Sequence, residues 1–243
     1  MSNMLNEILN SIENNDMRQF AEELIKTIPD YWYHVGASST GKYHPQYALG
    51  EGGLMRHTIA LVRFLNFTFE TEMFKFNSRE RDILRIAGLM HDSRKSGTQE
   101  DYEKSKYTNF DHPILAASVV HTFLRCGIIE DDEIEIICNA IKSHMGRWST
   151  DKRSDIVLPT PSDKYQKLLH LADYYTSRKC IEMLFDGFEV EKPTRDNYHI
   201  QFGKYKNKTI TEIIAEDKDY LIWLRDKADM ELRDPLKSLL AEL

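Results

Sequence analysis

Histidine and aspartate residues with the chemistry of metal ligands recur along this chain, and the adjacent pair His91 and Asp92 is the most informative of them. Imidazole and carboxylate together suit Mn, Fe, Co, Ni or Zn better than Mg or Ca, which prefer oxygen ligands. Neighbouring side chains on a helix point about 100° apart, so both residues can reach one ion only if the helix ends there and the backbone turns. Considered alone, such a pair is better explained as an ordinary helix end with a surface carboxylate.

Four further residues could complete a metal site with this pair. His57 follows the glycine pair 52–53 in the first turn of a predicted helix, and His112 projects from another helix start. His144 ends an apolar helical stripe, so it is expected to point inward. Asp173 lies in mid-helix on an apolar face, where a carboxylate is costly to bury unless it is paired or bound to a cation.

Each candidate also has a simpler interpretation. A lone histidine such as His57 is usually a satisfied core or surface residue, and Asp173 could form an ion pair with Arg178 or Lys179. The connection 30–53 is long for a compact domain, and long loops are often functional. The polar residues interpreted instead as solvated or structural are His34, His44, Glu51 and His121.

Hydrophobic spacing predicts the helices that must position these residues. The expected ranges are two short helices within 2–28, then 54–69, 78 to about 93, 111–127, 131–144 and 162–185. The expected N-caps are Ser78, Asp111, Asp131 or Asp132, and Ser162. All candidates except the tandem pair lie on separate helices. Their number and type match two divalent ions that share a bridging carboxylate and leave positions open for water and phosphate.

Composition sets limits on the class of protein. The chain has 243 residues with 41% hydrophobic and 29% charged residues, which is typical of a globular protein. It has no apolar run of roughly 18 residues for a membrane span, and residues 1–10 lack the features of a signal peptide. Three scattered cysteines predict a reducing, cytoplasmic location. A net charge of −7 disfavours a broad nucleic-acid-coating face but not a local basic channel or a small phosphorylated substrate.

The pattern predicts one large helical domain over 1–190, with N-terminal helices 1–30 packed on it, and a small α+β module over 198–243. Aromatic and basic residues alternate over 202–210, which is typical of a short hairpin or strand. Lysines 204, 206 and 208 of this segment could hold a nucleic acid backbone while its aromatic residues stack on bases. The alternative is that these aromatic residues pack the module and the lysines keep it soluble.

The pattern over roughly 45–180 resembles the HD-domain superfamily of metal-dependent phosphohydrolases. That signature, a His, then a His-Asp pair, then an Asp on a later helix, matches His57, His91, Asp92 and Asp173. The resemblance implies an all-α helical bundle with the ions at its centre.

Short segments around the ligands strengthen the resemblance. Residues 52–58, 88–92 and 171–173 are similar to family sequences, and the first is particularly similar to HD-type bacterial 3′–5′ exoribonucleases. His112 and His144 fall where two-metal members place their additional histidines.

The resemblance also implies roles. Asp92 would bridge two ions, with His57, His91 and Asp173 completing one site and His112 and His144 the other. Water activated by the metal would hydrolyse a phosphoester. Lys95 resembles a lysine often found three residues after the aspartate, and with Arg94 or Arg178 it would offset phosphoryl charge.

The C-terminal segment resembles a small module appended to some bacterial and phage exonucleases, through the opening 202–206 and a helix with Tyr220, Leu221, Trp223 and Leu224. Together these features favour a phosphodiesterase acting on nucleic acid ends or short oligonucleotides. A hydrolase of free (deoxy)nucleotides or cyclic nucleotides is the alternative, and an HD oxygenase with a di-iron site is a minor one. A regulatory module with a degraded site is disfavoured because the ligand set is complete. The sequence leaves the oligomeric state open.

Overall fold

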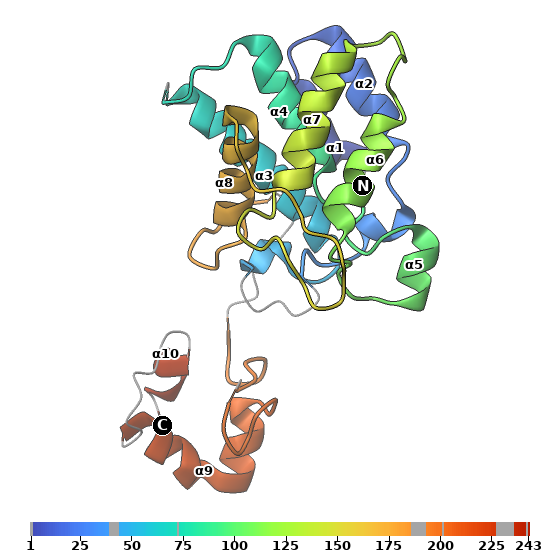
Figure 1. Cartoon of the computed structure of the whole chain (residues 1–243). Coiled ribbons are helices and arrows are strands. Elements are labelled where there is room, and N and C mark those ends of the chain that lie inside the picture. Colours follow the sequence, from blue (N-terminus) through green and yellow to red (C-terminus); the bar gives the residue numbers. More distant parts are fainter. Residues whose placement is uncertain are drawn as a thin grey trace. The chain divides into compact units, whose positions relative to one another are not determined.

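The computed structural model describes residues 2–38, 44–71, 73–185, 193–200, 202–226, 236–241 and 243. The chain divides into two compact units, Met1–Phe188 (unit 1) and Glu189–Leu243 (unit 2), which are described separately (Figure 1). Among the described residues, no helix combines the length and the apolar character that crossing a membrane requires.

Helices joined by turns and irregular connections build the described part of unit 1, as the sequence predicts. Its α-helices are α1 (Ser2–Ser11), α2 (Asn15–Ile25), α3 (Gly53–Glu70), α4 (Ser78–Met90), α5 (Gln99–Lys104), α6 (His112–His121), α7 (Asp131–Ser143) and α8 (Lys164–Thr176). Two short 3-10 helices, η1 (Asp30–Tyr33) and η2 (Gln46–Ala48), lie in the connection before α3. The all-α fold class is therefore confirmed for this unit.

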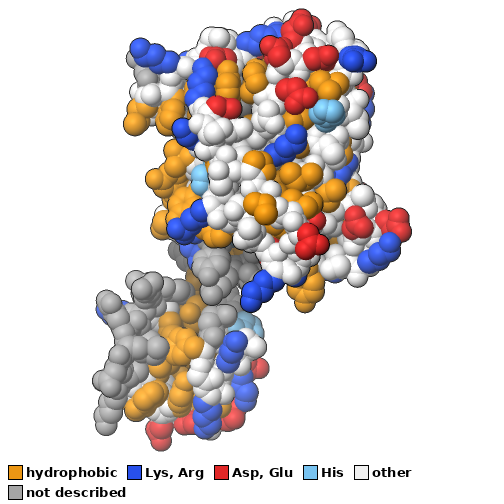
Figure 2. Space-filling model, viewed as in Figure 1, with side chains coloured by type: hydrophobic (Ala, Val, Ile, Leu, Met, Phe, Trp, Pro, Cys, Tyr) orange, Lys and Arg blue, Asp and Glu red, His pale blue; other side chains and the backbone are white. Residues whose placement is uncertain are grey.

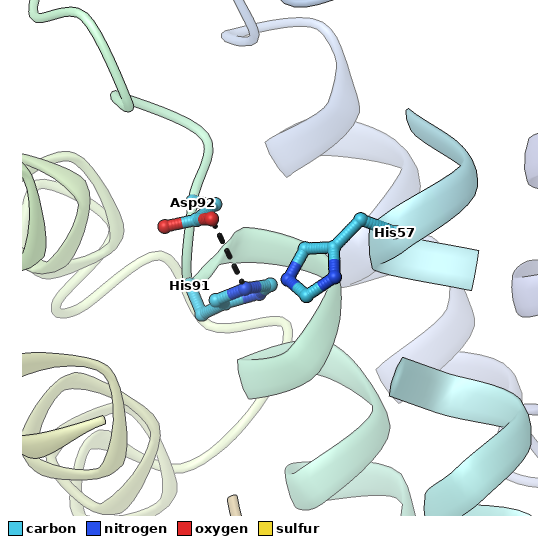
Figure 3. Close-up of side chains that lie close together, drawn as sticks. All are labelled: His57, His91 and Asp92. Atoms are coloured by element: carbon cyan, nitrogen blue, oxygen red, sulfur yellow. Dashed lines mark ion pairs between the residues drawn. The ribbon is translucent and has the colours of Figure 1, made fainter. Parts of the chain in front are cut away.

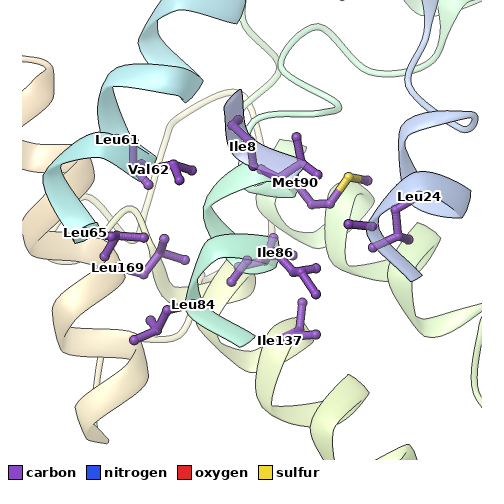
Figure 4. Close-up of a cluster of buried hydrophobic side chains, with 14 of the residues drawn as sticks. Ile8, Leu24, Leu61, Val62, Leu65, Leu84, Ile86, Met90, Ile137 and Leu169 are labelled. Atoms are coloured by element: carbon purple, nitrogen blue, oxygen red, sulfur yellow. The ribbon is translucent and has the colours of Figure 1, made fainter. Parts of the chain in front are cut away.

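Helix α4 is the central element of unit 1. It packs against α1, α2, α3, α7 and α8, while α6 packs against α7. Figure 4 shows the buried apolar side chains that meet around it, including Ile8, Leu24, Leu61, Val62, Leu65, Leu84, Ile86, Met90, Ile137 and Leu169. Burying this surface is the main force that holds the helices together, and it fixes the helix ends at which the candidate ligands lie.

Several helix boundaries differ from the sequence predictions. Asn77, not Ser78, caps α4, because its side chain accepts from the Glu80 backbone N–H in a reciprocal capping box. Helix α8 starts after an Asp163 capping box and ends at Thr176, well before the predicted end at 185. The Thr176 hydroxyl donates to the Ala172 carbonyl, and the next residues form turns.

The glycine pair before α3 lets two backbone segments approach closely. Gly52 has a φ of 68°, in the left-handed region that favours glycine. A Cβ at Gly53 would lie 2.4 Å from the Ala48 carbonyl oxygen, so only glycine fits there. Arg56 then ties the preceding connection to α3, since it donates to the carbonyls of Tyr47 at 2.6 Å and Leu49 at 3.0 Å.

Unit 2 contains α9 (Ile210–Asp226), kinked at Asp217, and α10 (Leu236–Leu240). Its core includes Ile200, Tyr205, Ile210, Ile213, Leu221, Leu224, Leu236 and Leu240. The predicted hairpin is represented among the described residues by one antiparallel bridge, between His199 and Thr209, and by no strand. Gly203 and Asn207 both have positive φ, so the backbone between them turns tightly and does not extend.

Candidate metal centre

Three elements bring the first group of ligands together. His57 comes from α3, the pair His91 and Asp92 lies at the C-terminal end of α4, and Asp173 comes from α8. His57 Nε2 lies 3.1 Å from Asp173 Oδ1, and His91 Nε2 lies 3.8 Å from the same oxygen. His91 Nε2 is also 3.4 Å from Asp92 Oδ2. Figure 3 shows His57 pointing toward the tandem pair.

The second group forms on the other carboxylate oxygen of Asp92. His112, from the start of α6, places Nε2 3.0 Å from Asp92 Oδ1, and His144, at the end of α7, places Nε2 3.5 Å from it. The two Nε2 atoms are 3.3 Å apart. All six predicted ligands therefore converge, and Asp92 is common to two clusters, His57 with His91 and His112 with His144, that could each hold a metal ion.

Backbone carbonyls orient three of the histidine rings. The Nδ1–H groups of His91, His112 and His144 donate to the carbonyls of residues 88, 109 and 141 at 2.6–2.8 Å. In a neutral imidazole with a proton on Nδ1, Nε2 carries a lone pair. His170 adds a further support, since its Nδ1–H donates to the His144 carbonyl at 2.7 Å. Such outer hydrogen bonds are typical of metal-ligating histidines.

The donor set fits a cation. His112 is fully buried, and burial together with the nearby Lys95 ammonium lowers its pKa to about 4, so its ring is neutral at pH 7. Its Nε2 lone pair then faces the Asp92 carboxylate, and neither atom can donate a hydrogen bond. Among the described residues, His91 Nε2 and Asp92 Oδ1 are buried without a hydrogen-bond partner. Opposed buried acceptors are unfavourable unless a cation lies between them.

Both carboxylates are held in the ionised form that metal binding requires. Burial alone would raise the pKa of Asp92, but the Lys95 ammonium and the neighbouring histidines hold it well below its usual value. Burial opposes ionisation of Asp173 in the same way, and the hydrogen bond from His57 together with nearby imidazoles lowers its pKa instead. The centre therefore offers two anionic carboxylates at pH 7.

The turn after α4 separates the roles of Lys95 and Arg94. Lys95 Nζ donates to Asp92 Oδ2 at 2.8 Å, and Lys95 lines the pocket beside the centre. The Arg94 guanidinium instead donates to the carbonyls of Thr27 at 2.7 Å and Ser93 at 3.2 Å. Arg94 thus anchors the turn, and its predicted role in offsetting phosphoryl charge has no support from this placement.

A pocket of about 410 Å³ opens beside the centre. Its walls include Asp173 and Lys95, together with His44, Met145, Arg147, Trp148, Ser177 and Arg178. Of these wall residues, the sequence prediction included Asp173, Lys95 and Arg178. The Arg178 guanidinium donates to the Tyr174 backbone carbonyl at 3.1 Å, and it lies 4.4 Å from the centre of the Tyr174 aromatic ring.

The sequence favours a solvated loop residue over a metal ligand at His44, and the structure places it half-buried in the pocket wall and outside the two ligand clusters. Its ring lies 5.6 Å from that of His57, centre to centre, and burial with the nearby charges of His57 and Lys95 lowers its pKa to about 3. The sequence feature that could have indicated a functional position for His44 was the unusual length of the connection 30–53. Arg147 and Trp148 were also missed, because they follow α7 in an irregular segment without a characteristic spacing.

The lysines predicted to contact nucleic acid lie on unit 2. Lys204 Nζ is 3.1 Å from Asp217 Oδ2, and Lys208 forms an ion pair with Glu216. Tyr205 is buried in the core of the unit, so packing explains this aromatic residue. Lys206 is exposed.

Comparisons with known proteins agree with this geometry. A family model described as HD domain matches residues 55–178, about half of the chain, and that range contains all six candidate ligands. A second model, described as Exodeoxyribonuclease X-like C-terminal, matches residues 200–229. Neither the curated proteins nor the solved structures gave a match. The chain therefore belongs to the HD-domain superfamily, which indicates a metal-dependent phosphohydrolase, and it carries an exonuclease-like C-terminal module.

Proposed function

We propose that this protein hydrolyses phosphodiester bonds at nucleic acid ends or in short oligonucleotides. The observation that carries the proposal is the pocket beside the His/Asp centre, where the cations Lys95, Arg147 and Arg178 surround the ligand Asp173 and an exposed indole, Trp148. Cations suit the anionic phosphate, and an aromatic face suits a nucleobase. The similarity of the C-terminal module to that of exodeoxyribonuclease X supports the same class of substrate.

The proposed mechanism assigns roles to the residues of this chain. His57, His91 and Asp173 would hold one divalent ion and His112 and His144 a second, with Asp92 shared. When bound, such ions supply Lewis acidity and a water of lowered pKa.

Lys95, fixed by its bond to Asp92, places a positive charge at the pocket wall beside the centre. Arg147 and Arg178 can offset the charge of the phosphoryl oxygens as it develops. His44, neutral at pH 7 because its pKa is about 3, can exchange a hydrogen bond with substrate without adding charge.

The identity of the metal and the role of unit 2 belong to this proposal. Mixed imidazole and carboxylate ligands favour Mn, Fe, Co, Ni or Zn over Mg. Contact of the C-terminal module with nucleic acid through Lys204, Lys206 and Lys208 is likewise proposed. Because the first and last of these lysines pair with acidic residues of the module, Lys206 is expected to contribute most.

The test is a substrate screen of the purified protein with Mn²⁺. The substrates are bis-p-nitrophenyl phosphate, p-nitrophenyl phosphate, mixed nucleotides, and short single-stranded RNA and DNA. We expect turnover of the diester and the oligonucleotides, and its loss in His91→Ala and Asp92→Ala. His121→Ala is the matched control, because His121 is exposed and pairs with Glu135 away from the ligands.

Two results would contradict the proposal. Turnover restricted to monoesters or free nucleotides would establish the alternative nucleotidase activity, for which a pocket of about 410 Å³ is also large enough. Metal binding and turnover that survive in both ligand variants would refute the site assignment itself.

A further inference from the structure

Three surface pockets of unit 1 adjoin one another, beginning at the metal centre. The pocket beside Asp173 shares the wall residue Arg147 with a second pocket of about 480 Å³. The second pocket shares Phe74 with a third pocket of about 420 Å³. Lys167 lines the second pocket and lies six residues before Asp173 on α8, which corresponds to about 9 Å along the helix axis. We call these three adjoining pockets the basic groove.

The charge of the basic groove is opposite to that of the whole chain. Its charged lining residues, from the metal centre outward, are Asp173, Lys95, Arg178, Arg147, Lys167, Lys75 and Arg81. Six of these residues are basic, and among the described lining residues the one carboxylate is a candidate metal ligand. The chain as a whole has 39 acidic and 32 basic residues. A local excess of positive charge within an acidic protein indicates an anionic ligand.

Aromatic side chains lie between these cations. Trp148 is 41% exposed, and its ring lies nearly parallel to that of Tyr174, with 17° between the planes and 5.9 Å between the centres. The Arg147 guanidinium is 4.7 Å from the centre of the Trp148 ring. Farther out, Phe74 lines both the second and the third pocket. The α3–α4 connection and α8 lie on the left of unit 1 in Figure 1, and in the same view Figure 2 shows hydrophobic and basic side chains along that side.

The combination of cations and aromatic faces distinguishes between anionic polymers. An acidic peptide would pair with the lysines and arginines but would leave the aromatic faces unused. Single-stranded nucleic acid uses both features, since its phosphates pair with cations and its unpaired bases stack on aromatic rings. The groove also ends at the centre where a phosphodiester would be cleaved, which matches a polynucleotide with one end in the active site.

We propose that the basic groove binds the single strand that leads away from the scissile phosphate. This inference rests on the proposed function. Arg147, Lys167 and Lys75 bind successive backbone phosphates, and Trp148 stacks on a base near the reacting end. The protein therefore binds an oligonucleotide more tightly than a dinucleotide, because the oligonucleotide extends beyond the first pocket.

The salt dependence of binding gives the expected magnitude. Each phosphate neutralised on a single strand contributes about −0.7 to the slope of log affinity against log salt. The three groove contacts contribute about −2 to the slope, which corresponds to a loss of affinity of roughly 20-fold between 50 and 200 mM salt. Removing Lys75 and Lys167 makes the slope shallower by about 1.4, so the loss of affinity over the same range becomes about 7-fold smaller.

The experiment measures binding of a fluorescent 12-nucleotide single strand to the full-length protein, with EDTA present so that cleavage does not interfere. The test variant is the double substitution Lys75→Ala and Lys167→Ala. The matched control is Lys26→Ala with Lys104→Ala, which removes the same charge from α5 and from the turn after α2, outside the groove. We expect the test variant to bind more weakly with the smaller slope, and the control to match the wild type.

Several outcomes would overturn the proposal. One is an equal slope of log affinity against log salt for the test variant and the wild type. The others are a duplex of the same length, or a dinucleotide, that binds as tightly as the 12-nucleotide single strand. Poly-glutamate that competes as well as an unlabelled oligonucleotide would assign the groove to acidic peptides. Circular dichroism and thermal unfolding of both double variants establish that they are folded.

This binding test and the substrate screen fail independently. If the slopes differ as expected but no phosphodiester is cleaved with any metal, the proposed function is wrong and the proposal of single-strand binding in the basic groove is supported. If diesters are cleaved but the slopes are equal, the proposed function is supported and the proposal of binding in the groove is wrong.

Discussion

The shared carboxylate of Asp92 leads to a specific prediction about metal stoichiometry. Its two oxygens lie toward different histidines, with Oδ2 near His91 and Oδ1 near His112 and His144. Replacing Asp92 by alanine therefore removes a ligand from both clusters. Replacing His57 or His112 by alanine removes a ligand from one cluster. We expect two bound ions in the wild type, one in each histidine variant, and weakened binding at both sites in Asp92→Ala.

The magnitude follows from linkage between binding and folding. A metal at 100 times its dissociation constant stabilises the folded state by about 2.7 kcal/mol per site. For a unit of this size, 1 kcal/mol shifts the melting temperature by about 2–4 °C, so each site contributes about 5–11 °C. The assay compares each variant with and without Mn²⁺, because Asp92→Ala also leaves the Lys95 ammonium without its carboxylate partner. Bound metal is counted by elemental analysis after desalting.

One result would refute the reasoning directly. If Asp92→Ala retains one ion with wild-type affinity, the carboxylate belongs to a single site and the two clusters do not share it. The control His121→Ala must keep both ions and the full thermal shift, because His121 is exposed and lies outside the clusters.

Three further predictions concern stability. Gly53→Ala places a methyl group 2.4 Å from the Ala48 carbonyl oxygen, and we expect urea denaturation to show a loss of about 1–3 kcal/mol. Asp82→Ala removes the nearer carboxylate partner of the buried Arg85, at 2.8 Å, and the acceptor of the Glu13 and Asn14 backbone N–H groups, so the same measurement should show a loss of about 3–5 kcal/mol. The folded pKa of His112, about 4, lies below the ordinary 6.5, so the unfolded state binds more protons between these values. The metal-free protein should therefore lose stability as pH falls from 6.5 to 4, with a smaller loss in His112→Gln.

The candidate ligands could be predicted from sequence because they form an ordered set that resembles a family signature, and because two of them have unusual helical positions. Asp173 stands out as a carboxylate on an apolar face, and His144 extends a buried stripe to the end of α7. Helical periodicity states which face is buried, so residues on that face must converge on the core. Their distances from one another follow from packing between helices, which periodicity does not contain.

The walls of the pocket could not be predicted in the same way. His44, Arg147 and Trp148 lie in connections, where no repeating spacing relates sequence position to direction. The early end of α8 was missed because the following residues keep enough apolar character to continue a helical pattern. The roles of Arg94 and Lys95 could not be distinguished from sequence, because adjacent basic residues look equivalent there. In the structure Arg94 donates to the Thr27 carbonyl, whereas Lys95 donates to the Asp92 carboxylate.

The turn after α4 explains how adjacent residues serve one centre. Helix α4 ends at Met90, and the backbone continues in tight turns with bonds from Ser93 N–H to the Met90 carbonyl and from Lys95 N–H to the Asp92 carbonyl, both 3.0 Å. These bonds span three residues, as in a 3-10 helix, where side chains three apart eclipse. Lys95 lies against Asp92 across this turn, with Nζ 2.8 Å from Asp92 Oδ2. The end of α4 and the turn that follows thus place Asp92 between the histidines of α6 and α7 and the lysine of its own turn.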